Sequence, residues 1–266
     1  MIDLEKYNYT LPEELIRKEG VEPRDSARLF VYDTATDTVT FDVFRNVAQY
    51  LQESSLMVLN NTRVLPARLW LKKETGGKIE VFVLANEVED ENHMPVLVDR
   101  KTGVGQKLFF PNGDCFEVLD QNENIFFVKI VSAQNLSLGD LLEKYGETPL
   151  PHYLEGADTK EDVLRKRYQT VFAKDGASVA APTASLHFTE EVFQSLEEKH
   201  IETDFLTLNV GLGTFAPLSD ENFETKKLHT EFIDVSKGVA NHINMAIAEK
   251  RNIIAVGTTA LRTLES

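Results

Sequence analysis

The chain has 266 residues, of which 42% are hydrophobic and 27% are charged, and its formal net charge is −15. The acidity argues against a nucleic-acid partner, because phosphate binding requires local positive charge, and the lack of an apolar run of about 18 residues excludes a membrane-spanning helix. The single cysteine excludes an intrachain disulfide, and the charged N-terminus lacks a signal peptide's apolar segment, so we expect a cytoplasmic protein.

In chain order, the first predicted element is a short helix over Leu11–Ile16, which has a proline near its start. A tight charge cluster of Arg24, Asp25 and Arg28 follows. Two guanidinium groups four residues apart suit recognition of an anion, and the alternative is an ordinary surface network of ion pairs. These three side chains are therefore candidate substrate-binding residues.

A β-hairpin, a helix and a buried strand come next. Leu29–Asp33 and Val39–Phe41 flank T-A-T-D and predict the hairpin, and Phe44–Gln52 has helical spacing. Leu56–Leu59 is an apolar strand that runs directly into Asn60-Asn61-Thr62-Arg63. Because ligands bind where strands of an α/β sheet end, this segment is a candidate binding site. Its candidate residues are Asn60, Thr62 and Arg63.

From about residue 67 the pattern changes to short alternating strands without helical periodicity. The predicted strands are Arg68–Leu71, Lys78–Leu84, Phe116–Leu119 and Ile125–Val131, and turn signals such as T-G-G-K separate them. This pattern favours a small antiparallel barrel or sandwich. We therefore expect an inserted β-rich domain over residues 67–147 and a main domain over residues 1–66 and 148–266.

The insert is predicted to end in a helix over Leu138–Tyr145, with Gly146 at the C′ position. After residue 178 the pattern alternates between strands and helices, which is typical of a parallel sheet with right-handed crossovers. The predicted strands are Val179–Ala181, Phe205–Val210, Phe232–Val235 and Ile253–Val256, and the predicted helices are Glu190–Lys199 and Val239–Lys250. We therefore expect an α/β fold whose main domain is built on a parallel sheet.

Three loops of this second half should meet at one edge of the sheet and form the active site. The first contains Pro182, Thr183 and His187, and it leads to Thr189, a predicted helix N-cap. His187 is the titratable side chain there that changes charge near neutral pH. The other loops are Gly211-Leu212-Gly213-Thr214-Phe215 and Gly257-Thr258-Thr259. The alternative interpretation of the first loop is a tight strand-to-helix connection with a half-buried histidine.

Two short motifs suggest other chemistry. Gly211–Ala216 matches G-x-G-x-x-A, and Glu231 follows about twenty residues later, as in dinucleotide-binding folds. Pro217 and the polar residues after it do not open an apolar-faced helix, which argues against a nicotinamide cofactor. His229 and Glu231 have the spacing of deaminase zinc ligands, but no cysteine pair accompanies them, which argues against a zinc site.

The segment A-A-P-T-A-S-L-H-F-T-E-E, at Ala180–Glu191, resembles the signature of the S-adenosylmethionine:tRNA ribosyltransferase-isomerase family of queuosine biosynthesis. Other blocks are similar to that family in the same order, and the likeness covers essentially the whole chain. They are Arg24–Leu29, Leu59–Arg68, Thr75–Lys78, Pro149–Pro151, Arg167–Phe172, Thr207–Phe215 and Ala255–Thr259.

The resemblance implies a transferase and isomerase that moves the ribosyl group of S-adenosylmethionine onto 7-aminomethyl-7-deazaguanine at the wobble position of tRNA. Epoxyqueuosine-tRNA, adenine and methionine would result, without a metal, and we expect a monomer. The reaction needs a base, help for the leaving adenine and precise placement. His187 and His229 are the available imidazoles, and Glu231 is an orienting group or second base.

The resemblance also implies how the remaining candidates act. Arg24, Arg28, Arg63, Thr258 and Thr259 would hold carboxylate, ribose or phosphate oxygens. We expect the glycines of the Gly211–Phe215 loop to let the backbone approach a ligand. The predicted substrate-binding residues are Arg24, Asp25, Arg28, Asn60, Thr62, Arg63, Thr183, Gly211, Gly213, Thr214, Thr258 and Thr259.

The sequence departs from the family pattern at several positions. Asn61 replaces the aspartate of N-D-T-R, Asn209 replaces the histidine of T-L-H-V-G, and Val98–Lys101 replaces R-P-G-K. The chain ends at Ser266, before the family's further strands and its T-N-F-H-L-P block. We therefore also consider a diverged or truncated relative that binds nucleoside or tRNA with weak or no catalysis. A third alternative is an unrelated small-molecule enzyme such as a dehydrogenase.

Overall fold

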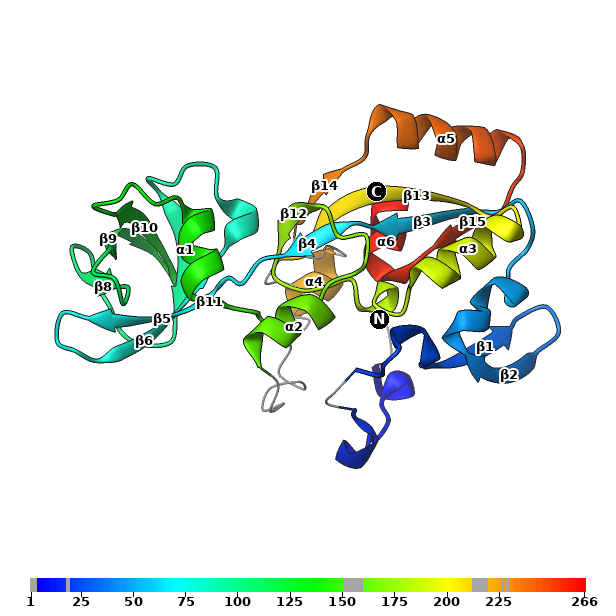
Figure 1. Ribbon diagram of the computed structural model, residues 1–266, viewed down its shortest axis with the longest axis horizontal. Helices are drawn as coiled ribbons and strands as arrows, with labels where there is room; N and C mark the ends of the chain where they lie inside the picture. The colour runs from blue at the N-terminus through cyan, green and yellow to red at the C-terminus, as the bar shows by residue number, and fades with distance from the viewer. Residues whose placement is uncertain (1–3, 18–19, 151–159, 212–219, 226, 228–229) are drawn as a thin grey trace.

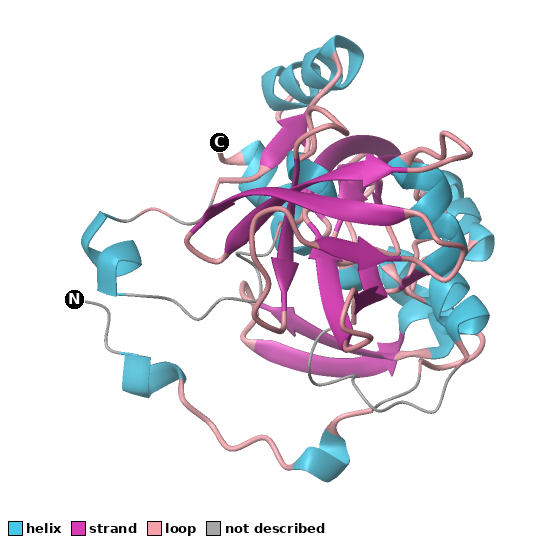
Figure 2. Cartoon of the chain, turned by 90° about the vertical axis from the view of Figure 1, so that its left-hand side faces the viewer, coloured by secondary structure: helices cyan, strands magenta, loops and turns pink. Residues whose placement is uncertain are grey.

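The computed structural model describes residues 4–17, 20–150, 160–211, 220–225, 227 and 230–266. Its described part combines helices with four β-sheets, so the expected mixed α/β class is confirmed. A barrel lies at one end of the molecule, and the sheet that carries the remaining long strands lies in the middle (Figure 1). In Figure 2 the strands occupy the centre and the helices lie around them.

The described N-terminal part consists of short 3-10 helices and one β-hairpin. The helix expected over Leu11–Ile16 is a single 3-10 turn, and the one expected over Phe44–Gln52 is also 3-10 rather than α. The hairpin forms as predicted, with Phe30 opposite Phe41. The bounds are η1 Leu4–Tyr7, η2 Glu13–Leu15, η3 Arg24–Ser26, β1 Arg28–Asp33, β2 Thr38–Val43 and η4 Phe44–Tyr50.

The central sheet has the strand order β14-β13-β3-β15. β13 (Glu202–Asn209) and β15 (Ile253–Ala255) both pair parallel to β3 (Leu56–Asn60). β14 (Phe232–Asp234) instead pairs antiparallel to β13, so the expectation that this strand would be parallel is wrong. An antiparallel strand at the edge of an otherwise parallel sheet is common, because an edge strand needs no crossover helix to reach its neighbour.

β3 lies in the middle of this sheet and is buried along its whole length. Leu56 and Val58 join a cluster that includes Ala246 of α5 (Lys237–Ala248), whereas Met57 and Leu59 join a cluster that includes Val192 of α3 (Glu190–Glu198). Helices therefore cover both faces, which explains why the strand has a continuous apolar sequence rather than an alternating one. The helices are α2 Glu161–Arg167, η7 Thr183–Ser185, α3 Glu190–Glu198, α4 Asp220–Thr225, α5 Lys237–Ala248 and α6 Gly257–Leu264.

Directly after β3, a short parallel pair joins β4 (Thr62–Val64) to β12 (Asp175–Ser178). The predicted strand over Val179–Ala181 is therefore misplaced, because β12 ends where it was expected to begin. β12 has the sequence D-G-A-S, which has little strand propensity. The strand was therefore predicted at the apolar residues that follow it. Those residues are buried but lie outside the strand.

All strands described between residues 68 and 147 belong to a seven-stranded antiparallel sheet. Pairing of β5 with β8 closes six of its strands into a barrel, and β11 adds to β5. Sequence patterns missed β7 and β8. The strands are β5 Arg68–Lys73, β6 Lys78–Val83, β7 Met94–Val98, β8 Lys107–Phe109, β9 Cys115–Asn122, β10 Ile125–Val131 and β11 Gly146–Glu147.

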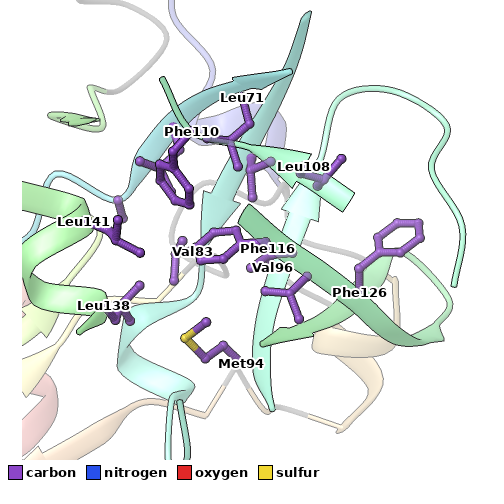
Figure 3. Close-up of a cluster of buried hydrophobic side chains, with 14 of the residues drawn as sticks. Leu71, Val83, Met94, Val96, Leu108, Phe110, Phe116, Phe126, Leu138 and Leu141 are labelled. Carbon is purple, nitrogen blue, oxygen red and sulfur yellow. The ribbon is translucent and has the colours of Figure 1, made fainter. Parts of the chain in front are cut away.

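Apolar side chains from every wall fill this barrel. Leu71, Val83, Val96 and Phe116 point into the shared core, and Leu141 of α1 (Leu138–Tyr145) closes one end (Figure 3). The helix has the predicted bounds, and Ser137 caps it in a capping box with Asp140. The barrel is therefore a packed core rather than an open channel.

Gly146 has a different role from the one predicted. Its φ of −77° is extended, so it is not a left-handed C′ residue. A Cβ at this position would overlap the carbonyl oxygen of Pro66. The glycine is therefore required because two backbone segments, the entry to the barrel and the exit from it, touch at this point.

Candidate active site

A buried polar cluster lies where β3 and β13 end and the β4–β12 pair begins. Thr62 Oγ1 lies 2.7 Å from Ser178 Oγ and 2.9 Å from Asn209 Oδ1. The Val210 N–H donates to Ser178 Oγ at 2.8 Å, and the Ala177 N–H donates to Asn209 Oδ1 at 3.2 Å. Because each of these side chains joins two chain segments, the cluster holds the ends of four strands in one arrangement.

Asn60 and Thr62 are part of this support. The side-chain nitrogen of Asn60 donates to the Leu208 carbonyl, and its oxygen accepts from the N–H groups of Thr62 and Leu208. Both side chains are fully buried. In this structure they position the strand ends, and a direct contact with substrate stays a prediction.

Three residues of the cluster, Gly176, Ser178 and Asn209, were not among the predicted site residues. Gly176 has a φ of +106°, and a Cβ there would lie 2.6 Å from Thr62 Oγ1 and closer still to Asn209 Oδ1. The glycine thus meets both a backbone and a packing requirement. Its presence in the weak strand D-G-A-S was a signal, since glycine inside a strand often marks a close approach.

A chain of hydrogen bonds connects His187 to β4. His187 Nδ1 lies 3.3 Å from the carbonyl oxygen of Arg24, and Arg24 Nη1 donates to the carbonyl of Gln169 at 2.8 Å. The side-chain amide of Gln169 then bonds both backbone groups of Val64, at 2.6 and 3.1 Å. Three segments that are far apart in sequence therefore meet here. Gln169 was not among the predicted site residues, although it lies in a block that resembles the family.

The contact of His187 with the Arg24 carbonyl favours one tautomer of its ring. Because a carbonyl oxygen only accepts, Nδ1 must carry the proton, which leaves Nε2 of the neutral ring with a free lone pair. The half-buried ring packs 5.4 Å from the ring of Phe44. Within the described part of the chain, Nε2 has no hydrogen-bond partner. This arrangement suits a general base. Thr189 caps α3 as predicted, with its Oγ1 accepting from Val192 N–H at 3.3 Å.

Three predicted arginines differ from the others in their charge environment. From residue 24 onward, within the described residues, only Arg24, Arg28 and Arg63 have no carboxylate within salt-bridge distance. Arg28 and Arg63 are exposed, and Arg24 is half-buried. Uncompensated guanidinium groups therefore belong to η3, to the start of β1 and to β4, in a chain with a strongly negative total charge. Such groups bind carboxylate and phosphate oxygens well.

Asp25 differs from the three arginines in its surroundings. It is buried, with 6% of its surface exposed, and it accepts a hydrogen bond at 3.3 Å from Arg45 of η4. It therefore anchors η3, the turn that carries Arg24, and its predicted role in substrate binding stays a prediction.

Two of the predicted loops converge as expected. A Cβ on Gly257 would lie 3.3 Å from the Cβ of Ala184, so the first turn of α6 touches η7. α6 has no side-chain cap at its N-terminus. The hydroxyl oxygens of Thr259 and Ser185 are buried and have no hydrogen-bond partner within the described residues. Thr183 and Thr258 are exposed at the same junction.

The third loop is described only in part. The Gly211 N–H donates to Glu231 Oε1 at 3.3 Å, and the other carboxylate oxygen of Glu231 pairs with Arg262 of α6. Glu231 therefore ties this loop to α6, and no hydrogen bond joins it to His187. His229, Gly213 and Thr214 lie outside the described residues.

Two features are absent from the residues that the structure describes. No helix has the length and apolar character needed to cross a membrane. No three His, Cys, Asp or Glu side chains gather closely enough to hold a metal ion.

Comparison with known proteins identifies similar chains. The family described as queuosine biosynthesis protein matches residues 4–266. A protein of Thermoanaerobacter sp. (strain X514) is 40% identical over 98% of this chain and 76% of its own length. One of Clostridioides difficile (strain 630) is 42% identical over 98% of this chain and 75% of its own length. Both are named S-adenosylmethionine:tRNA ribosyltransferase-isomerase.

A solved structure, the S-adenosylmethionine tRNA ribosyltransferase of Thermotoga maritima, aligns with 98% of this chain and 71% of its own. Its sequence is 26% identical, and the TM-score is 0.44.

Proposed function

The chain belongs to the queuosine biosynthesis protein family, and from this premise we propose that it transfers and isomerises the ribosyl group of S-adenosylmethionine onto 7-aminomethyl-7-deazaguanine in tRNA. The products are epoxyqueuosine-tRNA, adenine and methionine. The observation that carries the proposal is identity of about 40% to curated ribosyltransferase-isomerases over nearly the whole chain. The family and the enzyme class expected from the sequence motifs are thereby confirmed.

His187 is our candidate for the base. The sulfonium of S-adenosylmethionine acidifies the neighbouring ribose carbon, and a neutral imidazole with a free nitrogen is suited to remove that proton. A bond from Nδ1 to the Arg24 carbonyl favours the neutral tautomer whose lone pair is on Nε2, and it limits rotation of the ring. A second imidazole, His229, remains a candidate that lies outside the described residues.

The junction of η7 and α6 is our candidate site for S-adenosylmethionine. The first turn of α6 has backbone N–H groups without a side-chain cap, and such groups favour anions. The buried hydroxyls of Ser185 and Thr259 have no partner within the described residues, so a ligand there would satisfy them. We assign the methionine carboxylate to the α6 end, with Thr183 and Thr258 at the rim.

The three uncompensated arginines are our candidates for the phosphates of tRNA. Neutralising phosphates supplies much of the affinity for nucleic acid, and cations already paired with carboxylates contribute little. Gln169 connects two of them, because it hydrogen-bonds the backbone of Val64, the residue after Arg63, and its carbonyl accepts from Arg24. The acidic total charge is therefore compatible with RNA binding at this one place.

We further propose a domain division, an oligomeric state and a cellular location for the enzyme. Residues 67–147 form an inserted β-domain, and residues 1–66 and 148–266 form the main domain that carries the site. The enzyme acts as a monomer in the cytoplasm and needs no metal, which fits a reaction driven by a sulfonium leaving group.

Release of adenine tests the function. The purified chain is incubated with S-adenosylmethionine and tRNA that carries 7-aminomethyl-7-deazaguanine, and adenine is quantified by chromatography. We expect adenine in proportion to modified tRNA, and none with tRNA that lacks the modified base. Calorimetry with S-adenosylmethionine is run in parallel. Binding without adenine release would overturn the catalytic proposal and favour a relative that only binds its ligands.

A further inference from the structure

The β1–β2 hairpin has an exposed face with an unusual composition. Phe30 lies opposite Phe41, and Tyr32 lies opposite Val39, so all four side chains are on one face of the two-stranded sheet. Phe30 is 59% exposed and Phe41 77%. Their rings meet edge to face, with centroids 5.6 Å apart. An exposed cluster of aromatic side chains on a regular strand pair usually marks a binding surface.

The opposite face of the hairpin already has a partner. Asp42 accepts hydrogen bonds from Asn46 at 2.8 Å and from Tyr50 at 2.6 Å, and both donors belong to η4. Leu29 and Val31, on that same face, are half-buried. The aromatic face is therefore not needed to attach the hairpin to the rest of the protein.

Arg28 gives the aromatic face its charge. It begins β1 opposite Val43, and strand alternation puts it on the same side as Phe30. It is exposed and has no carboxylate within salt-bridge distance in the described chain. Asp33 and Asp37 lie at the far turn, where Asp37 accepts from Tyr32. The face thus carries one free cation, at the end nearest η3 and His187.

We infer that this face binds unpaired nucleotides of RNA, with bases stacked on Phe30 and Phe41 and a phosphate on Arg28. Aromatic rings beside a guanidinium are the combination that proteins use to hold single-stranded nucleic acid. The inference rests on the proposed function, because a substrate base that enters beside His187 brings its neighbouring unpaired nucleotides over the segment that follows Arg24. A second copy of the chain is the competing occupant.

RNA binding without catalysis tests the inference. The probes are a fluorescently labelled RNA stem-loop and a labelled blunt RNA duplex of equal length, and binding is measured by fluorescence anisotropy. Phe41→Leu keeps the apolar surface but removes the ring, and we expect it to weaken stem-loop binding about ten-fold. Phe41→Tyr should bind as the parent chain does. Arg28→Gln should reduce the slope of affinity against salt by about one.

The outcomes separate this inference from the proposed function. Equal stem-loop affinity of Phe41→Leu and the parent chain would overturn it, as would equal affinity of the parent chain for stem-loop and duplex. A parent dimer in sedimentation velocity that Phe41→Leu dissociates would also overturn it, because a second copy would then cover the face. The adenine assay on the parent chain decides the proposed function independently, since no binding measurement here requires turnover.

Discussion

The side-chain amide of Gln169 hydrogen-bonds both backbone groups of Val64, donating to its carbonyl at 2.6 Å and accepting from its N–H at 3.1 Å. One side chain thus pairs with the edge of β4 as a neighbouring strand would. Its own carbonyl also accepts from Arg24, whose carbonyl in turn bonds His187. Gln169 therefore connects the strand that carries Arg63 to the candidate base.

This pair of hydrogen bonds predicts that lowering the pH restores the turnover of a Gln169→Glu variant. In Gln169→Glu, the ionised carboxylate still accepts from Val64 N–H but faces the Val64 carbonyl without a proton, so we expect about ten-fold lower turnover near pH 8. Repulsion raises the pKa of the introduced carboxyl, and protonation restores the missing donor. The ratio of variant to parent turnover should therefore rise as the pH falls toward about 5. Gln169→Met has no proton to gain, and its ratio should stay flat. A ratio for the glutamate variant that does not change with pH would contradict the positioning role.

His187→Ala tests the base. If Nε2 removes the proton, turnover at saturation should fall about 10²–10⁴-fold, while affinity for S-adenosylmethionine changes only a few-fold. Melting temperature is the control for folding, and His200→Ala, at an exposed histidine after α3, is the matched variant. A variant with weakened binding and a lower melting temperature but normal saturated turnover would show that the ring only supports the loop.

Arg63→Gln tests the phosphate contact. Arg63 is exposed and without a carboxylate partner within the described residues, so its loss should raise the KM for tRNA and reduce the salt slope of binding by about one. Arg100→Gln is the comparison, because Arg100 pairs with Asp99 on the barrel. If both variants change the salt slope equally, Arg63 has no special place in RNA binding.

Gly146→Ala tests the contact at the entry to the barrel. Its added methyl group meets the backbone oxygen of Pro66, which cannot move aside as a side chain can, so we expect a loss of stability above about 3 kcal/mol. Gly103→Ala is the control, because nothing lies within 4 Å of a Cβ there. Urea unfolding of both variants measures the difference. Similar midpoints would mean that the two segments separate readily.

His242 gives the protein a stability that depends on pH. Its Nδ1 lies 2.7 Å from Asp204 and its Nε2 2.9 Å from Glu202, and Arg251 also pairs with Glu202. Burial lowers the pKa of His242, but the hydrogen bonds to the two carboxylates outweigh it and raise that pKa. A raised folded pKa stabilises the protein fully below the ordinary value of about 6.5, and the gain is lost as the pH rises through the folded pKa.

The expected measurement compares melting temperatures of the parent chain and His242→Gln. The parent should be more stable near pH 6, and the gap should close toward about pH 9. A gap that widens with pH would contradict the sign of the shift.

Sequence patterns predicted the long and strongly periodic elements well. The hairpin, the helices α1 and α3 and the apolar strand β3 all follow from periodicity and caps, since local pattern and burial agree there. The position of β12 was predicted wrongly because a strand made of small residues has no such pattern. The direction of β14 was predicted wrongly because the orientation of a strand depends on the strand it pairs with.

The candidate site was predictable as a set of loops, but not as a set of roles. Motifs located His187, Arg24 and Arg63. They did not reveal that Asn60, Thr62 and Asp25 are buried supports, because burial depends on which distant segment covers each side chain. Gln169 was missed for the same reason, since its partners are 105 and 145 positions away in sequence.

The pairing of β11 with β5 has a consequence for how the chain folds. Gly146 lies opposite Leu69, so the first strand of the barrel is hydrogen-bonded to the strand that follows the barrel in sequence. Once the barrel forms, residues that border it on either side are already neighbours, and the long loop between them no longer adds to the entropy of closing later contacts. The effective sequence separation between β3 and β13 is thereby shortened. The barrel, synthesised before β13 and β15, would let the parallel sheet assemble with a lower contact order than the linear sequence implies.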